Sequence, residues 1–312
     1  MLQRFLVYLD EHFPFLMQGI LLVVIGICGI NFSMRARGFA NDVILPDQLE
    51  SLPVLLSVLL AFIGALSFFV QLRLVEEAKN SADNLKFRLY RAAPRAVVSS
   101  RKLATIAFVL MPIQLGLACW LNVQLLWPLL LVWSYLWLMR HAFFISKWRK
   151  PRPLFYGLAH WVIMPLIFLY MTACDWMVVR AAPPPGLPWF LLVGFFTGLN
   201  FEIGHKIRAP RDEESDVETY SKLWGRRTAV TAWLCVMVLT GATTIVTAHF
   251  LHLGTLMFAL IIILLTAGVL IGDRFLQSPI TAYASSIKKF SAIYALVLYL
   301  SLTIMPFFAL FH

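Results

Sequence analysis

Acidic and amide side chains gather in two short stretches of this chain of 312 residues. The first stretch places its oxygen-bearing side chains at helical spacing, so that they share one face of a helix. They are Glu77, Asn80 and Asn84, with Arg73 on the same face and Glu76 beside it. Carboxylate and amide oxygens suit Mg²⁺, a hard cation that proteins commonly share with phosphate groups. We therefore predict that this face binds a metal ion and an anion.

Basic residues surround the same face and continue beyond it. Besides Arg73, they include Lys79, Arg88, Arg91 and Arg95. Guanidinium and ammonium groups form strong charge-assisted hydrogen bonds with phosphate oxygens. The alternative is a solvated helix end on which acids and bases pair with one another.

The second stretch begins with Glu202, which directly follows an apolar run. A carboxylate at such a position is costly, so it usually has a partner or a function. Lys206, one helical turn later, is the candidate partner, and Arg208 follows it. The acidic run at 212–218 comes next, and for that run a solvated loop is the favoured explanation.

The elements that carry these stretches are membrane-spanning helices. Hydrophobic residues make up 60% of the chain and charged residues 13%, a balance that requires a bilayer as solvent. A helix needs about 20 apolar residues to cross the hydrocarbon layer. The chain has seven apolar runs, and two of them are long enough for two helices each. Turn signals at 122–124 and near 249–254 divide these two runs, which gives nine predicted spans. The apolar runs are 14–30, 54–70, 103–139, 154–174, 187–201, 228–272 and 290–311.

The distribution of basic residues predicts the orientation of these spans. With the N-terminus in the cytoplasm, 23 of the 26 lysines and arginines fall in inner segments and three in outer ones. We predict a cytoplasmic N-terminus, an outer C-terminus and, as the setting, a bacterial inner membrane. The net charge of +10 then follows from topology, and nucleic acid is not an expected partner.

Both chemical stretches fall in cytoplasmic loops of one predicted transmembrane domain, 1–312. The first motif loop is 71–102 and the second is 202–227. At these residues the sequence resembles the UbiA superfamily of intramembrane prenyltransferases, nine-helix proteins with aspartate-rich motifs at the cytoplasmic ends of helices two and six. The Arg-rich segment at 87–95 and the segment at 220–227 are similar to the family's stretches that follow each motif.

The resemblance implies a role for each residue. The first motif of the family, N-D-x-x-D-x-x-x-D, falls on Glu76, Glu77, Asn80 and Asn84, so none of its aspartates is kept. Glu202 stands at the first acid of the second motif, and Lys206 stands at the second. By this resemblance the metal ligands are Glu76, Glu77, Asn80, Asn84 and Glu202, and Glu77, Asn80 and Glu202 are catalytic. The diphosphate ligands are Arg73, Lys79, Arg88, Arg91, Arg95, Lys206 and Arg208.

The fold implied by the resemblance is an all-α bundle of nine helices around a central cavity, open to the cytoplasm and to lipid. The implied reaction is Mg²⁺-dependent transfer of an isoprenoid group from a prenyl diphosphate to a small-molecule or lipid acceptor. An allylic cation would form and be shielded by aromatic residues on the fourth and fifth spans, such as Trp161 and Tyr170. The oligomeric state and the acceptor stay open.

Three alternatives remain. The replaced aspartates are compatible with a non-catalytic relative that binds a polyprenyl lipid or a partner subunit. A terpene cyclase of the same superfamily would use the same diphosphate chemistry. A transporter is disfavoured because the charged residues lie at helix ends rather than at mid-membrane, and the sequence has no inverted repeat.

Overall fold

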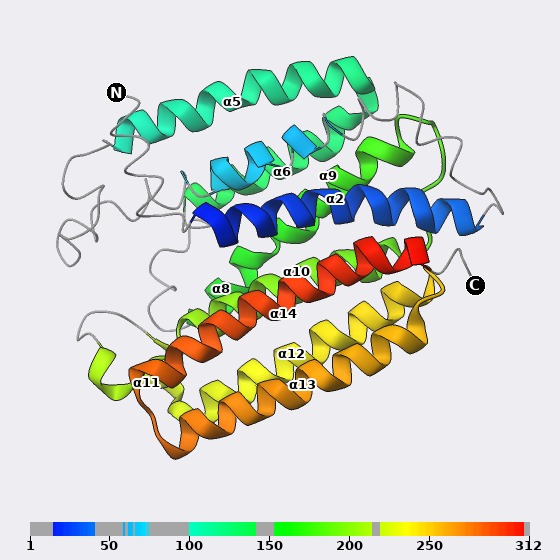
Figure 1. The fold of residues 1–312 in the computed structure, drawn as a ribbon. Coiled ribbons are helices and arrows are strands. Elements are labelled where there is room, and N and C mark those ends of the chain that lie inside the picture. Colours follow the sequence, from blue (N-terminus) through cyan, green and yellow to red (C-terminus); the bar gives the residue numbers. More distant parts are fainter. Residues whose placement is uncertain are drawn as a thin grey trace. The chain divides into compact units, whose positions relative to one another are not determined.

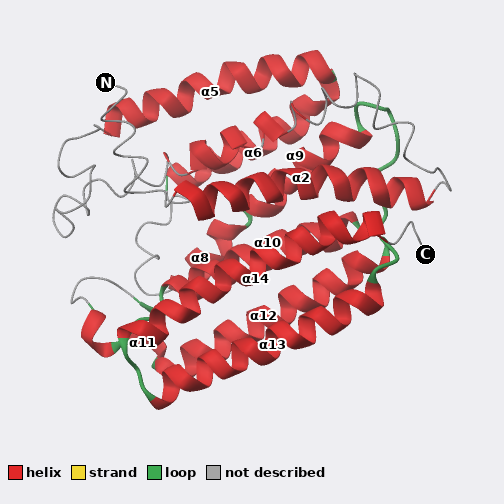
Figure 2. Ribbon diagram, viewed as in Figure 1, coloured by secondary structure: helices red, strands yellow, loops and turns green. Residues whose placement is uncertain are grey.

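The structure is a computed structural model that describes residues 15–40, 59, 62–64, 66–72, 74, 100–141, 153–213 and 219–308. Regular structure over these ranges is entirely helical, and Figure 2 draws it without a strand. The prediction of an all-α protein is therefore confirmed for the described residues.

The chain divides into two compact parts, the N-terminal part and the C-terminal part. The N-terminal part comprises Met1–Met34, Ile44–Pro151 and Leu169–Pro183, and the C-terminal part comprises Arg35–Val43, Arg152–Phe168 and Pro184–His312. The second motif lies wholly in the C-terminal part.

The N-terminal part contains most of α2 (Phe15–Ala40), the apolar helix Phe62–Leu72, α5 (Ser100–Leu121), η1 (Val123–Leu125) and α6 (Leu126–Arg140), which Figure 1 shows. The predicted turn at 122–124 is confirmed. Asn122 caps η1, because its side-chain oxygen accepts a hydrogen bond from the Gln124 amide at 2.9 Å. Its side-chain nitrogen donates to the Met177 carbonyl, also at 2.9 Å, which fixes the turn to the part of the chain that follows α9.

A closed group of polar side chains lies inside the N-terminal part, and we call it the Gln114 cluster. Gln114 is completely buried, donates to the Ser67 hydroxyl at 2.7 Å and accepts from the Trp133 indole at 2.8 Å. Ser67 in turn donates to the Gly64 carbonyl at 2.6 Å. Each side chain is satisfied by another helix or by its own, which is what a low-dielectric interior requires.

The fifth predicted span, 154–174, is divided in the structure into α8 (Pro153–Trp161) and α9 (Ile163–Trp176). Pro165 has no amide hydrogen to donate to the Trp161 carbonyl, and its ring crowds that carbonyl, so the helix is interrupted there. The sequence prediction of one unbroken helix did not allow for this proline.

Four helices of the C-terminal part form a bundle (Figure 1). They are α10 (Leu187–His205), α12 (Arg226–His249), α13 (Gly254–Gln277) and α14 (Thr281–Phe308). The helix α10 packs on α12 and α14, and α13 packs on both of these as well, so the four helices close into a ring. The predicted break near 249–254 is confirmed, because α12 ends at His249 and α13 starts at Gly254.

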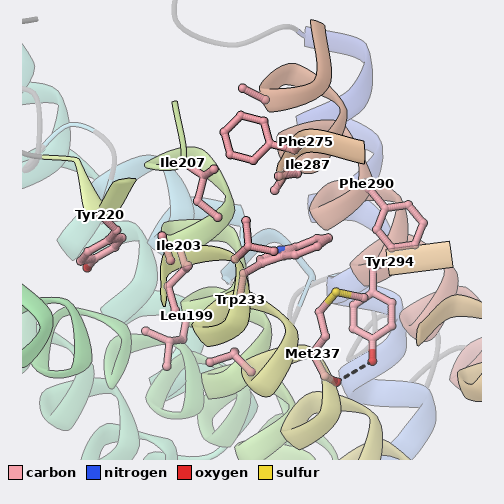
Figure 3. Packing of buried hydrophobic residues seen from close by; sticks show 14 of the residues in the cluster. Leu199, Ile203, Ile207, Tyr220, Trp233, Met237, Phe275, Ile287, Phe290 and Tyr294 are labelled. Carbon is pink, nitrogen blue, oxygen red and sulfur yellow. Dashed lines mark hydrogen bonds between the residues drawn. The ribbon is translucent and has the colours of Figure 1, made fainter. Parts of the chain in front are cut away.

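Small residues allow these helices to approach closely. A side chain at Gly204 of α10 would collide with the Ser291 hydroxyl of α14, and that hydroxyl accepts a hydrogen bond from the Trp233 indole at 2.9 Å. Figure 3 shows Trp233 in the middle of the apolar core, between Ile203 and Phe290. This packing fixes α10, and therefore the residues at its C-terminal end.

Several helices extend past their predicted limits. The span predicted at 187–201 continues as α10 to His205, and the span predicted at 290–311 begins at Thr281. Likewise α2 continues to Ala40, and Arg35, expected in an outer segment, is a buried helical residue. The sequence prediction ends each helix at the limit of its apolar run, but a helix can continue through the polar headgroup region outside the hydrocarbon layer.

Six helices in the described part of the chain are long and apolar enough to cross a membrane. The shorter apolar helices Phe62–Leu72 and Thr105–Leu121 add to these. The count of nine spans, the central cavity and the orientation of the termini stay predictions.

Candidate functional site

The first predicted motif lies outside the described residues. This applies to every member of that patch, namely Arg73, Glu76, Glu77, Lys79, Asn80, Asn84, Arg88, Arg91 and Arg95. Whether the two patches converge therefore stays a prediction. Of the second motif loop, the structure describes residues 202–213 and 219–227.

The last turn of α10 carries an ion pair. Lys206 Nζ lies 2.6 Å from Glu202 Oε1, and the two side chains are 38% and 21% exposed. Because they stand four residues apart, the acid first, the pair adds support to the final turn of the helix. The predicted partnership of Glu202 and Lys206 is confirmed.

Tyr220 contacts Lys206 through both its backbone and its ring. It opens the short helix α11 (Tyr220–Trp224), and its backbone N–H donates to the Lys206 carbonyl at 3.1 Å. Lys206 Nζ lies 5.4 Å from the centroid of the Tyr220 ring, within cation–π range. The Tyr220 ring also stacks on Trp224, with the ring centroids 4.3 Å apart. The ammonium group is thus held between a carboxylate and an aromatic face.

The hydroxyl group of Tyr220 is buried without a hydrogen-bond partner among the described residues. The side chain is only 1% exposed. A methyl group added at Gly157 of α8 would lie 3.1 Å from this hydroxyl and 4.0 Å from Cγ of Glu202, so α8 lies against both residues. Burial raises the pKa of Tyr220, and the charge of Glu202 raises it further. The hydroxyl therefore remains a proton donor well above neutral pH.

The chain between α10 and α11 is fixed by hydrogen bonds around Glu213. The Ser221 hydroxyl donates to Glu213 Oε1 at 2.5 Å, and the Thr219 hydroxyl donates to the other carboxylate oxygen. Ser221 also accepts from the backbone N–H of Arg208 at 3.0 Å. Glu213 therefore shapes the loop, and this part of the predicted acidic run is structural rather than solvated.

Arg208, predicted to bind diphosphate, has one defined role in the loop. Its guanidinium Nη1 donates to the Asp212 carbonyl at 3.3 Å, and the Asp212 carboxylate accepts from Thr281 at 3.1 Å. The structure thus brings Glu202 and Lys206 together, whereas Arg208 is directed at least partly to its own loop.

The same fold occurs in a known membrane enzyme. The solved structure of a digeranylgeranylglyceryl phosphate synthase, a UbiA-superfamily intramembrane prenyltransferase, matches this chain with a TM-score of 0.62 at 15% identity. The match covers 97% of this chain and 99% of that one. The chain has the same fold as that enzyme. No family model and no curated protein matches the sequence.

The UbiA fold confirms the resemblance that the sequence indicated, at the level of architecture. Together with the six long apolar helices, it identifies the chain as a multi-pass integral membrane protein. The identity of 15% leaves activity and substrates as proposals.

The second motif does not fit a divalent metal ion. Where the UbiA motif has a second acid, this chain has Lys206, whose ammonium group already occupies one oxygen of Glu202 at 2.6 Å. No group of three His, Cys, Asp or Glu side chains that could hold a metal was found among the residues the structure describes. Mg²⁺ prefers several oxygen ligands and is repelled by a neighbouring ammonium. Metal binding at the first motif, which lies outside the described residues, stays a prediction.

Sequence reasoning missed Tyr220 and Gly157 as members of this site. Tyr220 is 14 residues from Lys206, and only the route of the loop around Glu213 brings its ring under the ammonium group. Gly157 belongs to a different helix. The one available signal was the position of Tyr220 at the start of the segment that resembles the UbiA family.

Proposed function

We propose that this protein transfers an isoprenoid group from a prenyl diphosphate to an acceptor within the membrane. The UbiA fold over almost the entire chain supports this proposal. The observation that carries it is the arrangement at the end of α10, where the ammonium group of the Glu202–Lys206 ion pair lies over the ring of Tyr220, whose own hydroxyl is buried and unpartnered among the described residues.

These groups suit the departure of a diphosphate. As the bond to the isoprenoid carbon breaks, negative charge accumulates on the diphosphate oxygens. A fixed ammonium group and a hydroxyl donor stabilise that charge without needing to reorganise, which is the largest source of rate enhancement in many enzymes. Lys206 and Tyr220 provide these two groups, and Glu202 positions Lys206.

Further parts of the proposal rest on the sequence. Arg73, Lys79, Arg88, Arg91 and Arg95 would hold the substrate from the first motif at the cytoplasmic mouth. The allylic cation would be shielded by aromatic side chains away from water. Dependence on Mg²⁺ is a further prediction, and it depends on the oxygen ligands of the first motif, Glu76, Glu77, Asn80 and Asn84.

The direct test is release of pyrophosphate by the purified protein in detergent. Geranyl, farnesyl and geranylgeranyl diphosphate are each supplied with Mg²⁺ and a panel of lipid and small-molecule acceptors. We expect release with at least one donor, together with a prenylated product. Absence of release from every donor and acceptor would contradict the proposal.

A matched pair of variants separates the site from general charge effects. Glu202→Gln removes the carboxylate that holds Lys206, and Asp273→Asn makes the same chemical change at an exposed position at the end of α13. Because a catalytic group displaced by about 1 Å can lose a hundredfold in rate, we expect Glu202→Gln to lower turnover by roughly tenfold to a hundredfold. Asp273→Asn should leave the rate unchanged.

A non-catalytic relative is the second candidate, and the lysine in place of a motif acid favours it. Such a protein would bind a polyprenyl lipid or a partner subunit without turnover. It should keep full function in cells when Glu77→Ala or Glu202→Ala is introduced, whereas an enzyme should lose it. A cyclase would release pyrophosphate without an acceptor and yield a cyclic hydrocarbon, which product analysis would identify.

A further inference from the structure

In the second motif a lysine stands where the UbiA pattern has an acid. This replacement makes the net charge of the motif more positive by two, which is the charge of one divalent metal ion. Two carboxylates at the motif positions carry two negative charges, which one Mg²⁺ would neutralise. Glu202 and Lys206 together carry no net charge without any metal. The metal-free motif of this chain therefore has the same net charge, zero, as the family pattern with one Mg²⁺ bound.

The contacts of Lys206 give this charge a fixed position. The ammonium group is 2.6 Å from Glu202 Oε1 and 5.4 Å from the centroid of the Tyr220 ring. The backbone of the same lysine is bound by the Tyr220 N–H at 3.1 Å. An ammonium group has three donors, and the ion pair to Glu202 occupies one of them. The Lys206 side chain is 38% exposed, so it is not enclosed by the rest of the protein.

A second observation indicates a ligand at the same place. The Tyr220 hydroxyl is buried and unpartnered within the described part of the chain, beside α8 and close to Glu202. A buried hydroxyl without a hydrogen bond is costly, and a bound oxyanion would remove that cost.

We propose that Lys206 is a built-in cation that replaces a divalent metal ion at the second motif, and that it binds a diphosphate together with the Tyr220 hydroxyl. This inference rests on the proposed function, because it names how the donor substrate is held. It concerns binding alone, and its central consequence is that binding at this half of the site does not need a metal.

Binding of two probes in EDTA tests the inference. The probes are inorganic pyrophosphate and farnesyl thiolodiphosphate, a stable analogue of a prenyl diphosphate, measured by isothermal titration calorimetry on the full chain. We expect the wild-type protein to bind both without Mg²⁺. Adding Mg²⁺ should change the affinity less than the loss of Lys206 does.

Three variants assign the binding to the two residues. Lys206→Met removes the charge, and we expect affinity in EDTA to fall by about tenfold to a hundredfold, the usual loss for a charged hydrogen bond. Lys206→Arg keeps the charge and should stay within about threefold of the wild type, because its longer fork still reaches phosphate oxygens. Tyr220→Phe keeps the ring and should cost about fivefold. Lys289→Met, an exposed lysine of α14, is the control and should bind as the wild type does.

Lys206→Asp gives the sharpest readout because it restores the acid of the family pattern. We expect this variant to lose binding in EDTA and to regain it when Mg²⁺ is added. Circular dichroism and size-exclusion chromatography establish that each variant is folded before its affinity is compared.

The outcomes separate the inference from the proposed function. Wild-type binding that requires Mg²⁺, or Lys206→Met binding as tightly as the wild type in EDTA, would overturn the inference and leave prenyl transfer intact. No binding of either probe with or without Mg²⁺, combined with no pyrophosphate release, would overturn both.

Discussion

The Gln114 cluster and the site formed by Lys206 and Tyr220 are two groups of polar side chains with buried members, and they differ in how completely those members are hydrogen-bonded. In the Gln114 cluster, the amide of Gln114 bonds to both Ser67 and Trp133, and Ser67 donates to the Gly64 carbonyl, so each of these side chains has at least one partner. At the end of α10, the Tyr220 hydroxyl has no partner among the described residues. Asn200, also on α10, has a side-chain oxygen and a side-chain nitrogen that likewise lack a hydrogen-bond partner among the described residues.

The difference distinguishes polar groups that hold helices together from polar groups available to a ligand. A satisfied buried hydrogen bond contributes modestly to stability, and breaking it leaves a costly orphan. A buried polar group without a hydrogen-bond partner lowers the stability of the ligand-free protein, and such a group is retained where it serves binding. Mutations in the two regions should therefore change stability in opposite directions.

The largest effect is expected in the Gln114 cluster. Gln114→Leu keeps the volume but leaves the Trp133 indole without its acceptor and deprives Ser67 of a donor. We expect the free energy of unfolding to fall by about 2 kcal/mol. Thermal unfolding in detergent measures the change, and pyrophosphate affinity should stay as in the wild type. An unchanged melting temperature would show that the cluster does not stabilise its part of the molecule.

Asn200→Leu should act in the opposite direction. Asn200 is 1% exposed, and neither its oxygen nor its nitrogen has a hydrogen-bond partner in the described ranges. An apolar side chain of similar volume avoids the free-energy cost of burying an amide without hydrogen bonds. We therefore expect a gain of about 1 kcal/mol in the free energy of unfolding. The same unfolding assay applies. A loss of stability would mean that the amide is hydrogen-bonded, for example to a buried water.

Tyr220→Phe should separate stability from binding. The variant loses a hydroxyl that makes no bond in the described structure and keeps the ring that contacts Lys206 and Trp224. We expect the free energy of unfolding to stay constant or to rise by less than about 1 kcal/mol. Affinity for pyrophosphate should nevertheless fall. A clear drop in stability with unchanged affinity would place Tyr220 among the structural groups.

The sequence predicted the elements of this fold well because each depends on local chemistry. Apolar runs marked the helices, Asn122 marked the first turn, and the break after His249 was visible as a polar interruption. The division at Trp161 depends on where one proline falls within an apolar run. The helix α10 continues to His205, so the predicted end of this span at Phe201 was wrong.

The candidate site was only partly predictable, and for a physical reason. The pairing of Glu202 with Lys206 follows from their spacing on a helix. The position of Tyr220 depends on a loop whose path is fixed by Glu213, Thr219 and Ser221, and no periodic pattern encodes such a path. The misfit of a metal at this motif required the observed 2.6 Å contact between the lysine and the carboxylate.

The most direct test is an experimental structure of the wild-type protein bound to farnesyl thiolodiphosphate, prepared once in EDTA and once with Mg²⁺. The account predicts diphosphate density within hydrogen-bonding distance of Lys206 Nζ and the Tyr220 hydroxyl in both preparations, with no metal bound to Glu202. Diphosphate density remote from these two groups, or a metal ion on Glu202 with Lys206 turned away, would contradict it.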